Sequence, residues 1–292
     1  IFIVNIDSQK ANDTAAEWLK NCGLFSENAV ERAIYIEYTG DKNGNGVPDV
    51  DEMEIHEFKG DGDFRSKECI ELLKQCDVVV TNPPFSLFRE FVAQLIEYNK
   101  KFIIIGNVNA LSYKEIFPLI QNTQMWIGAS IHSGDRKFYV PNDYELNASG
   151  CGIDDNGKKF IRVKGVRWFT NIDYKERHEE MILYKSYSPD AYPKYENFNA
   201  INVDKTTDIP LDYDGIMGVP ITFIDKYCPE QFEIIGLGIA NLGLSCGVQP
   251  YKPEHKKYRK EVQKRGAVDG DLYMITNGEV NVPYARILIK RK

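Results

Sequence analysis

The stretch Asp77-Val78-Val79-Val80-Thr81-Asn82-Pro83-Pro84-Phe85 decides the fold of this chain. Three valines and a threonine favour a β-strand. Two consecutive prolines end it abruptly, and the pattern from Leu87 to Tyr98 predicts an amphipathic helix. Ligands of α/β sheets bind beyond the carboxyl ends of the strands. We therefore predict a buried strand, Val78 to Val80, that presents the tetrapeptide after it to a ligand.

The residue types of the tetrapeptide suit the binding of a planar amine. Asn82 carries an amide carbonyl that accepts hydrogen bonds. Pro83 and Pro84 lack an N–H and have a fixed φ, so their carbonyls remain available as acceptors. Phe85 offers a flat ring for stacking. We predict that Asn82, Pro83, Pro84 and Phe85 form a catalytic site; the alternative is a structural strand-to-helix turn.

Residues 77–89 resemble the catalytic motif of the amino-methyltransferases, which transfer a methyl group from S-adenosylmethionine to an exocyclic nitrogen. A wider set of segments is similar to the EcoRI-type adenine-specific DNA methyltransferases. The resemblance covers the chain from about Ile34 to the C-terminus, and the segments that carry it are Lys59 to Ser66, Thr81 to Glu90, Phe102 to Asn107, Arg167 to Asn171 and Tyr284 to Lys290.

This resemblance implies an activity and a fold. The activity is site-specific methylation of adenine N6 in double-stranded DNA, with S-adenosylmethionine as cofactor, in a restriction–modification system or a mobile element. The fold is α/β, with a Rossmann-like methyltransferase sheet and a β-rich C-terminal region. Two alternatives remain: a glutamine or RNA amino-methyltransferase, and a non-catalytic DNA-binding remnant.

The resemblance also implies which residues bind the cofactor. Asp63 and Phe64 are expected to hold its adenine, through the carboxylate and the ring respectively. Asp7 and Glu37 are further candidates, for the methionine moiety and the ribose hydroxyls, although a surface carboxylate is the favoured interpretation of both. The glycine-rich turn usual in this class is not found upstream of Asn82. Because the chain begins with Ile1 and a strand-like run, we expect an N-terminal segment to be missing.

Residues 41–52 match the pattern of an EF-hand calcium loop. The ligand positions are filled by Asp41, Asn43, Asn45 and Glu52, and Gly46 occupies the glycine position. The flanking segments favour strands, however, and Asn-Gly-Asn-Gly is a hairpin-turn signal. We therefore expect a hairpin tip and predict no metal site.

Composition sets further limits. The chain has 292 residues, of which 43% are hydrophobic and 27% charged, as in ordinary globular proteins. Since no apolar run approaches the roughly 20 residues of a membrane span, we expect no membrane association. The six cysteines include no Cys-x-x-Cys pair, which favours reduced thiols and a cytoplasmic location.

The net charge of −7 contrasts with three local basic clusters. Binding to DNA phosphates requires local positive charge rather than a basic total. Each cluster is either a DNA contact or a solvated face. The clusters are Lys158, Lys159, Arg162, Lys164 and Arg167; Lys252, Lys256, Lys257, Arg259, Lys260, Lys264 and Arg265; and Arg286, Lys290, Arg291 and Lys292.

The order of elements predicts two parts. Up to about Gln124, strand and helix signals alternate, which favours a mostly parallel sheet; the predicted helices span 13–19, 66–75, 87–98 and 113–119. Short strands follow, among them 137–140, 160–168 and 181–184. We predict a catalytic domain over 1–187 and a DNA-recognition region over 188–292; the sequence does not predict the oligomeric state.

Overall fold

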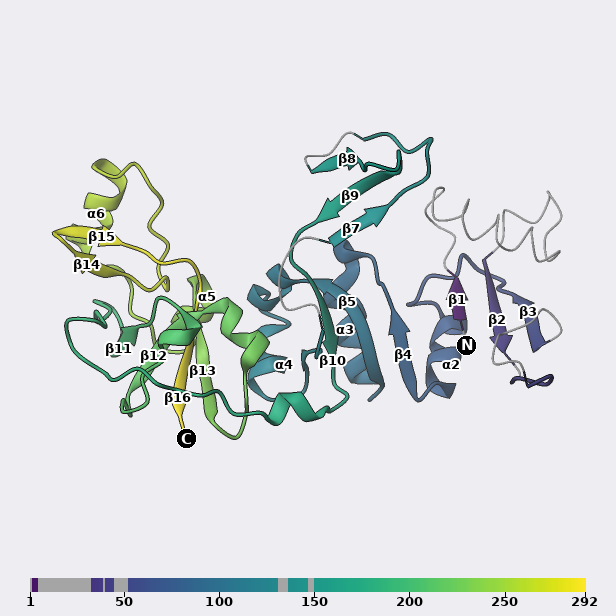
Figure 1. Cartoon of the computed structure of the whole chain (residues 1–292), viewed down its shortest axis with the longest axis horizontal. Coiled ribbons are helices and arrows are strands. Elements are labelled where there is room, and N and C mark those ends of the chain that lie inside the picture. Colours follow the sequence, from purple (N-terminus) through teal and green to yellow (C-terminus); the bar gives the residue numbers. More distant parts are fainter. Residues whose placement is uncertain (1, 5–32, 39, 45–51, 131–135, 147–149) are drawn as a thin grey trace. The chain divides into compact units, whose positions relative to one another are not determined.

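The computed structural model describes residues 2–4, 33–38, 40–44, 52–130, 136–146 and 150–292 (Figure 1). They form two compact units: Ile1–Val79 with Gln94–Lys100, and Val80–Ala93 with Lys101–Lys292. Helices combine with sheets of both parallel and antiparallel strands, which confirms the α/β class. The helix predicted over 13–19 lies outside the described residues. Within the described residues, no helix is sufficiently long and apolar to span a bilayer.

The first unit contains an antiparallel sheet, one complete described helix and the end of another. The sheet has the order β1-β2-β3, and the complete helix is α2 (Lys67–Gln75). Ser66 caps α2 by accepting from the Cys69 N–H, as predicted. The Lys100 ammonium donates to two carbonyls at the other end of α2, where the helix dipole favours a cation. The strands are β1 (Phe2–Val4), β2 (Ile34–Tyr38) and β3 (Met53–Glu57).

A second sheet has the order β4-β5-β10-β6. Its strands are β4 (Val78–Thr81), β5 (Lys101–Asn107), β10 (Val166–Thr170) and β6 (Trp126–Ile127). The helical segments between β4 and β6 are η2 (Phe85–Leu87), α3 (Phe88–Glu97), η3 (Val108–Ser112) and α4 (Phe117–Gln121). The helix predicted over 113–119 begins only at Phe117, because Pro118 favours the first turn of a helix.

The prediction of a mostly parallel sheet is wrong. β10 runs antiparallel to both β5 and β6, and the sheet of the first unit is antiparallel throughout. The strand beside β5 comes from far along the chain, after a long excursion between Asn107 and Val166. Alternating strand and helix signals describe neighbours in sequence, so they do not reveal an inserted antiparallel partner.

The third sheet belongs to the C-terminal half and has the order β11-β12-β16-β13. β11 and β12 are parallel, and β16 runs antiparallel to both of its neighbours. A hairpin, β14-β15, and two helices accompany it. The elements are β11 (Ala200–Asn202), β12 (Ile216–Pro220), β13 (Phe232–Gly238), α5 (Ala240–Ser245), α6 (Pro253–Glu261), β14 (Met274–Thr276), β15 (Glu279–Asn281) and β16 (Arg286–Arg291). Three short helical turns, η4 (Lys175–His178), η5 (Thr206–Asp208) and η6 (Ile221–Lys226), complete the connections.

Two contacts, one buried and one partly buried, join the second and third sheets within the second unit. Arg167 of β10 donates to both carboxylate oxygens of Asp225 in η6, at 3.0 and 3.1 Å. Gln121 of α4 donates to the carbonyls of Ile234 and Ile235 in β13, at 3.3 and 2.9 Å. The predicted boundary at residue 188 therefore falls inside a compact unit, and the functional division made there remains a prediction.

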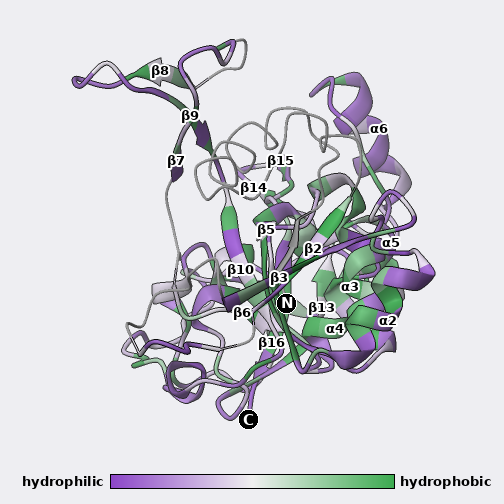
Figure 2. Ribbon diagram, turned by 90° about the vertical axis from the view of Figure 1, so that its right-hand side faces the viewer, coloured by the Kyte–Doolittle hydropathy of each residue, from purple (hydrophilic) through white to green (hydrophobic). Residues whose placement is uncertain are grey.

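The remaining sheet is a small antiparallel one, β7-β9-β8, which we call the arm. Its strands are β7 (Arg136–Tyr139), β8 (Cys151–Ile153) and β9 (Lys159–Val163). Figures 1 and 2 show the arm extending away from β5 and β10. The single strand predicted over 160–168 is wrong, because a turn at Lys164–Gly165 separates β9 from β10. Gly165 has a φ of +70°, which favours glycine.

The strand predicted over 181–184 is also absent, although these residues are described. Met181 instead exchanges two hydrogen bonds with the Gln231 side chain, at 2.9 and 2.8 Å. A side-chain amide thus occupies the backbone groups that a neighbouring strand would otherwise pair with. The alternation of apolar and polar residues does not distinguish these two partners.

Candidate active site

The tetrapeptide forms an exposed turn between β4 and α3. Asn82 follows the last residue of β4 and its side chain is exposed, whereas Pro83 is buried. The Leu87 N–H donates to the Pro84 carbonyl at 3.0 Å and closes the first turn of η2. The Pro83 carbonyl precedes that helical turn. Phe85, the first residue of η2, has a ring that is 42% exposed. The turn therefore presents an amide carbonyl and an aromatic ring to solvent.

The expectation that the preceding strand is buried is wrong. Val78 and Val80 are 46% and 66% exposed. Among the described strands, β4 lies at the edge of its sheet and pairs with β5 alone. Valine favours strands through its branched side chain, whether the strand lies in the centre of a sheet or at its edge. The composition of this run therefore predicted the strand but not its burial.

A buried aromatic pair fixes the start of α3. The Phe88 ring packs edge-on against Phe169 of β10, with a centroid separation of 5.2 Å and an interplanar angle of 62°. Both rings lie over Gly106 of β5, where a Cβ atom would come within 2.7 Å of each ring. Only glycine leaves room for this packing. Because Phe88 directly follows η2, the pair also fixes the turn that carries Phe85.

Asp63 and Phe64, the residues expected to hold the cofactor's adenine, lie in the first unit just before α2. Asp63 Oδ1 accepts from the Arg65 N–H and Nε at 2.8 and 2.9 Å, and Oδ2 accepts from Nη2 at 2.7 Å. These bonds hold the pKa of Asp63 below its usual range, so the side chain is an ionised acceptor. The Phe64 carbonyl accepts from the Gln94 side chain at 2.9 Å, which fixes this loop to the end of α3 that belongs to the same unit.

Comparison with known proteins identifies the family. The profile of the family described as "Adenine-specific methyltransferase EcoRI" matches residues 6–292. The chain belongs to this family. The Type II methyltransferase M.EcoRI of Escherichia coli is 44% identical over 295 residues, which cover 100% of this chain and 81% of the relative.

Two mycoplasma relatives match over shorter segments. M.MgeORF184P of Mycoplasma genitalium is 42% identical over 183 residues, which cover 61% of this chain and 57% of the relative. M.MpnI of Mycoplasma pneumoniae is 40% identical over 191 residues, which cover 63% and 60%. Both are Type II methyltransferases by name. No solved structure matches the chain significantly.

Membership of the EcoRI methyltransferase family confirms the predicted activity, which is site-specific methylation of adenine in DNA. It also confirms that the protein is an enzyme, so the glutamine-specific, RNA-specific and non-catalytic alternatives are set aside. A methyltransferase requires a methyl donor. The family does not by itself assign a role to any of the residues described above.

The other cofactor candidates differ in what the structure describes. Asp7 lies outside the described residues. Glu37 lies in β2 with an exposed side chain, and its Oε2 is 3.7 Å from His56 Nε2. The carboxylate faces solvent, where both the ribose-binding role and the surface-carboxylate alternative remain open.

The EF-hand-like loop connects two paired strands. β2 and β3 are antiparallel, with Tyr38 opposite Met53, so the flanking elements are strands rather than the helices of an EF-hand. Glu52, at the twelfth position, is buried, and its Oε1 accepts from the Lys42 N–H at 2.6 Å. Asp41 accepts from the Gly44 N–H at 2.7 Å. These bonds lie at the two ends of the connection, and the antiparallel pairing of β2 with β3 agrees with the expected hairpin. Asn45 and Gly46 lie outside the described residues, so the hairpin tip itself remains a prediction.

The three basic clusters differ in their surroundings. Arg167 is 5% exposed and bound to Asp225, so it does not belong to a DNA-binding face as the sequence suggested. In the two C-terminal clusters, several cations contact carboxylates. These pairs are Lys252–Glu196, Lys256–Asp269, Lys257–Glu261, Arg286–Asp204 and Arg291–Asp214. Adjacent positive charges in sequence do not reveal such partners.

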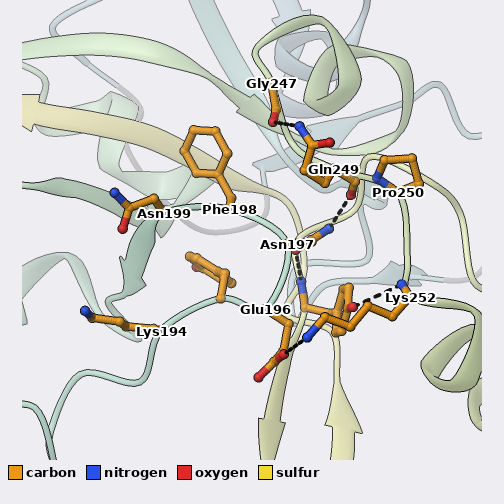
Figure 3. Close-up of a pocket in the computed structure, with 11 residues that line it drawn as sticks. Lys194, Glu196, Asn197, Phe198, Asn199, Gly247, Gln249, Pro250 and Lys252 are labelled. Atoms are coloured by element: carbon orange, nitrogen blue, oxygen red, sulfur yellow. Dashed lines mark hydrogen bonds and ion pairs between the residues drawn. The ribbon is translucent and has the colours of Figure 1, made fainter.

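The sequence also did not predict a hollow of about 650 Å³ beside β11. Figure 3 shows Lys194 and Asn199 on one side of it, and Gln249 and Lys252 on the other. Asn197 holds the two sides together, because its Nδ2 donates to the carbonyls of Gln249 and Asp271 at 2.8 and 2.9 Å. The hollow lies in the region expected to recognise DNA; its lining includes amides and two lysines, of which Lys252 is paired with Glu196 at 2.7 Å.

Proposed function

We propose that the Asn82–Phe85 turn binds the N6 amino group of an adenine extruded from duplex DNA, and that S-adenosylmethionine donates the methyl group. The observation that carries this proposal is the turn itself. An exposed amide carbonyl, the carbonyl of Pro83 and an exposed ring follow one another at the end of a strand. The family is adenine-specific, so adenine is the base that we assign to this turn.

The geometry suggests how the turn acts. A base inside a duplex cannot be reached, so an enzyme that modifies it must extrude it. The carbonyls of Asn82 and Pro83 accept the two N6 protons, and the Phe85 ring stacks on the purine. This orients the nitrogen lone pair away from the turn, toward the methyl donor.

The turn contributes mainly by positioning. S-adenosylmethionine supplies an electrophilic methyl group on a sulfonium sulfur when it is bound. Asn82 and Pro83 hold the amino nitrogen in line with that methyl group, and correct orientation accounts for much of the rate of such reactions. The extra proton leaves the nitrogen after transfer and passes to solvent, so the turn requires no strong base. Phe88 and Gly106 keep the turn in place.

The Asp63–Phe64 pair fits the adenine of the cofactor. Asp63 Oδ2 accepts one hydrogen bond from Arg65 and retains the capacity to accept another from an amino group. Phe64 supplies a ring for stacking. We also infer a Rossmann-like sheet into which the antiparallel strand β10 is inserted. In support, β4 and β5 are neighbours and α3 connects them, as in a strand–helix–strand unit.

Three further assignments complete the proposal. The substrate is double-stranded DNA, and residues 188–292 contribute to its recognition. The system is of the restriction–modification type, since the relatives are named Type II methyltransferases. The location is cytoplasmic, as the cysteine content suggested.

Product mapping tests the proposal. Mixed-sequence duplex DNA is incubated with the protein and S-adenosylmethionine labelled in its methyl group, and the DNA is digested to nucleosides. The expected product is labelled N6-methyladenine at one recurrent sequence, and the same DNA in single-stranded form is expected to react far less. Label on cytosine, or equal labelling of both forms of DNA, contradicts the proposal.

A further inference from the structure

We propose that one face of the arm binds the phosphates of duplex DNA through Lys137 and Arg162, which the buried Phe160 ring holds in position. The inference rests on DNA being the substrate. It extends DNA binding to the arm, which precedes the region 188–292 that the sequence favoured for recognition.

The arm lacks a covering layer in the described part of the chain. Its three strands hydrogen-bond only to one another among the described strands. All four residues of β7 are exposed, and large apolar side chains on the arm remain open to solvent: Tyr139 is 59% exposed and Ile153 is 61% exposed. A sheet normally buries at least one face, so a surface of this kind indicates a binding partner.

Strand register assigns the side chains to two faces. Lys137 lies directly opposite Arg162, and Tyr139 lies opposite Phe160, so these four residues share one face. We call it the cationic face. Arg136 lies on the opposite face, because successive residues of a strand alternate. That face also carries Phe138 and Ile153.

A buried ring organises the cationic face. Phe160 is 8% exposed and packs over Gly152 of β8, where a Cβ atom would come within 2.9 Å of the ring. Lys137 Nζ lies 4.6 Å from the centroid of this ring, and Arg162 Cζ lies 5.7 Å from it. The cations therefore flank one ring, in the geometry of cation–π contacts.

Aromatic contacts fix a cation without cancelling its charge. A carboxylate partner would neutralise it, whereas the ring holds the side chain and leaves the full positive charge facing solvent. Within the described part of the chain, no carboxylate lies within ion-pair distance of Lys137 or Arg162. Among the described residues, the face therefore presents two fixed cations without a carboxylate partner, on a protein whose net charge is −7.

The partner that fits this face is duplex DNA. Its backbone is a regular array of negative charges, which guanidinium and ammonium groups bind. A small β-ribbon also has dimensions that the major groove accommodates. A second copy of this chain is also acidic, but DNA is the substrate and, as a duplex, carries the denser and more regular negative charge, about one per 1.7 Å of helix axis, which favours DNA as the partner.

The salt dependence of DNA binding tests the proposal. The full chain is titrated into a fluorescent mixed-sequence duplex at several salt concentrations, for the native protein and for Lys137→Gln/Arg162→Gln. Each lost phosphate contact reduces the slope of log K against log[salt] by about 0.9, so the slope should fall by about 1.8. The dissociation constant at low salt should rise roughly tenfold or more.

Two control variants show whether the reduced salt slope comes from the loss of cations on the cationic face or from the loss of positive charge in general. Arg136→Gln removes one charge from the opposite face of the same strand and should leave the slope unchanged. Lys137→Arg/Arg162→Lys preserves both charges and should retain the native slope. An unchanged slope in the Lys137→Gln/Arg162→Gln variant overturns the proposal, as does an equal loss for Arg136→Gln. Light scattering that shows an arm-dependent dimer, together with an unchanged slope, assigns the face to a second copy instead.

This test is independent of the catalytic assignment. Asn82→Ala should abolish methyl transfer while retaining the native slope. If Asn82→Ala remains active, the catalytic proposal fails and the arm proposal stands. If only the slope prediction fails, the arm proposal fails and the catalytic one stands.

Discussion

The arm and the C-terminal half carry similar clusters of Lys and Arg, but the groups that face these cations differ. On the arm, Lys137 and Arg162 flank the ring of Phe160. In the C-terminal half, Lys256 and Arg291 lie 2.6 and 3.3 Å from carboxylates. Aromatic partners leave the positive charge available to a ligand, whereas carboxylate partners neutralise it.

The partners of the cations, rather than the net charge of the chain, determine where an acidic protein can bind DNA phosphates. Its basic residues are numerous, but many of those near the C-terminus are already paired within the chain. The charge available to phosphates is therefore smaller and more localised than the sequence indicates. Counting cations along the chain overestimates the DNA-binding surface, and the partners of each cation correct that estimate.

The largest effect is expected where a cation is paired and buried. Asp225→Ala removes the carboxylate that accepts two hydrogen bonds from the buried Arg167 guanidinium, a change that typically costs about 3–5 kcal/mol. Asp214→Ala, which removes the exposed partner of Arg291, should cost less than about 1 kcal/mol. Denaturant unfolding of both variants measures the difference. Equal losses of unfolding free energy would show that burial does not distinguish these pairs.

The next effect sharpens the account of the arm without altering any charge. Gly152→Ala places a methyl group 2.9 Å from the Phe160 ring. The ring must then move, and Lys137 and Arg162, which flank it, lose their fixed positions. DNA affinity should fall roughly three- to tenfold, by part of the loss expected from removing the two charges. Gly266→Ala serves as the comparison, because a Cβ atom there would meet open space and the residue has no positive φ. If Gly152→Ala binds DNA with native affinity, the position of the Phe160 ring does not determine that affinity.

A smaller effect is expected from the paired cations of the C-terminal half. Lys256→Gln/Arg291→Gln removes two charges, as the arm variant does, but these charges are already compensated by Asp269 and Asp214. The salt slope should change by less than about 0.5, well below the change expected for two phosphate contacts. The same anisotropy titration measures it. A loss as large as that of the arm variant would contradict the distinction between the two regions.

The smallest effect concerns a cation whose charge depends on pH. Hydrogen bonds from His178 to Asp173 and Glu230 raise the pKa of this histidine. Its stabilising contribution is therefore complete below the unfolded pKa of about 6.5 and is lost as the pH rises through the folded pKa. The same bonds lower the pKa of both carboxyls, whose contribution is lost at acid pH. The melting temperature of His178→Gln should approach that of the native protein as the pH rises from 6 to 8; a constant difference would contradict this.

Local signals in the sequence were reliable guides to local structure. The Ser66 cap, the helix after it and the strand–turn–helix around Asn82 are set by neighbouring residues, so they could be predicted. The strands on either side of residues 41–52 were likewise expected from their composition. Each of these features depends on backbone preferences that act over a few residues.

Features that depend on distant partners were missed. The position of β10 beside β5, the exposure of β4 and the pairing of Arg167 with Asp225 all involve groups far apart in the chain. The requirement for glycine at Gly106 is another case, since it follows from two rings contributed by other elements. In the candidate site, residue types suggested the chemistry of the turn, but its support by Phe88 became evident only from the fold.

The most direct test of the central claim is single-turnover methyl transfer by Asn82→Ala at saturating DNA and S-adenosylmethionine. The matched control is Asn241→Ala, which changes an exposed asparagine in α5. We predict that Asn82→Ala binds duplex DNA with near-native affinity but forms N6-methyladenine at least about a hundredfold more slowly, because the amino group is no longer held in line. The control should react at the native rate. Near-native turnover by Asn82→Ala would contradict the claim that this turn binds the amino group of the adenine.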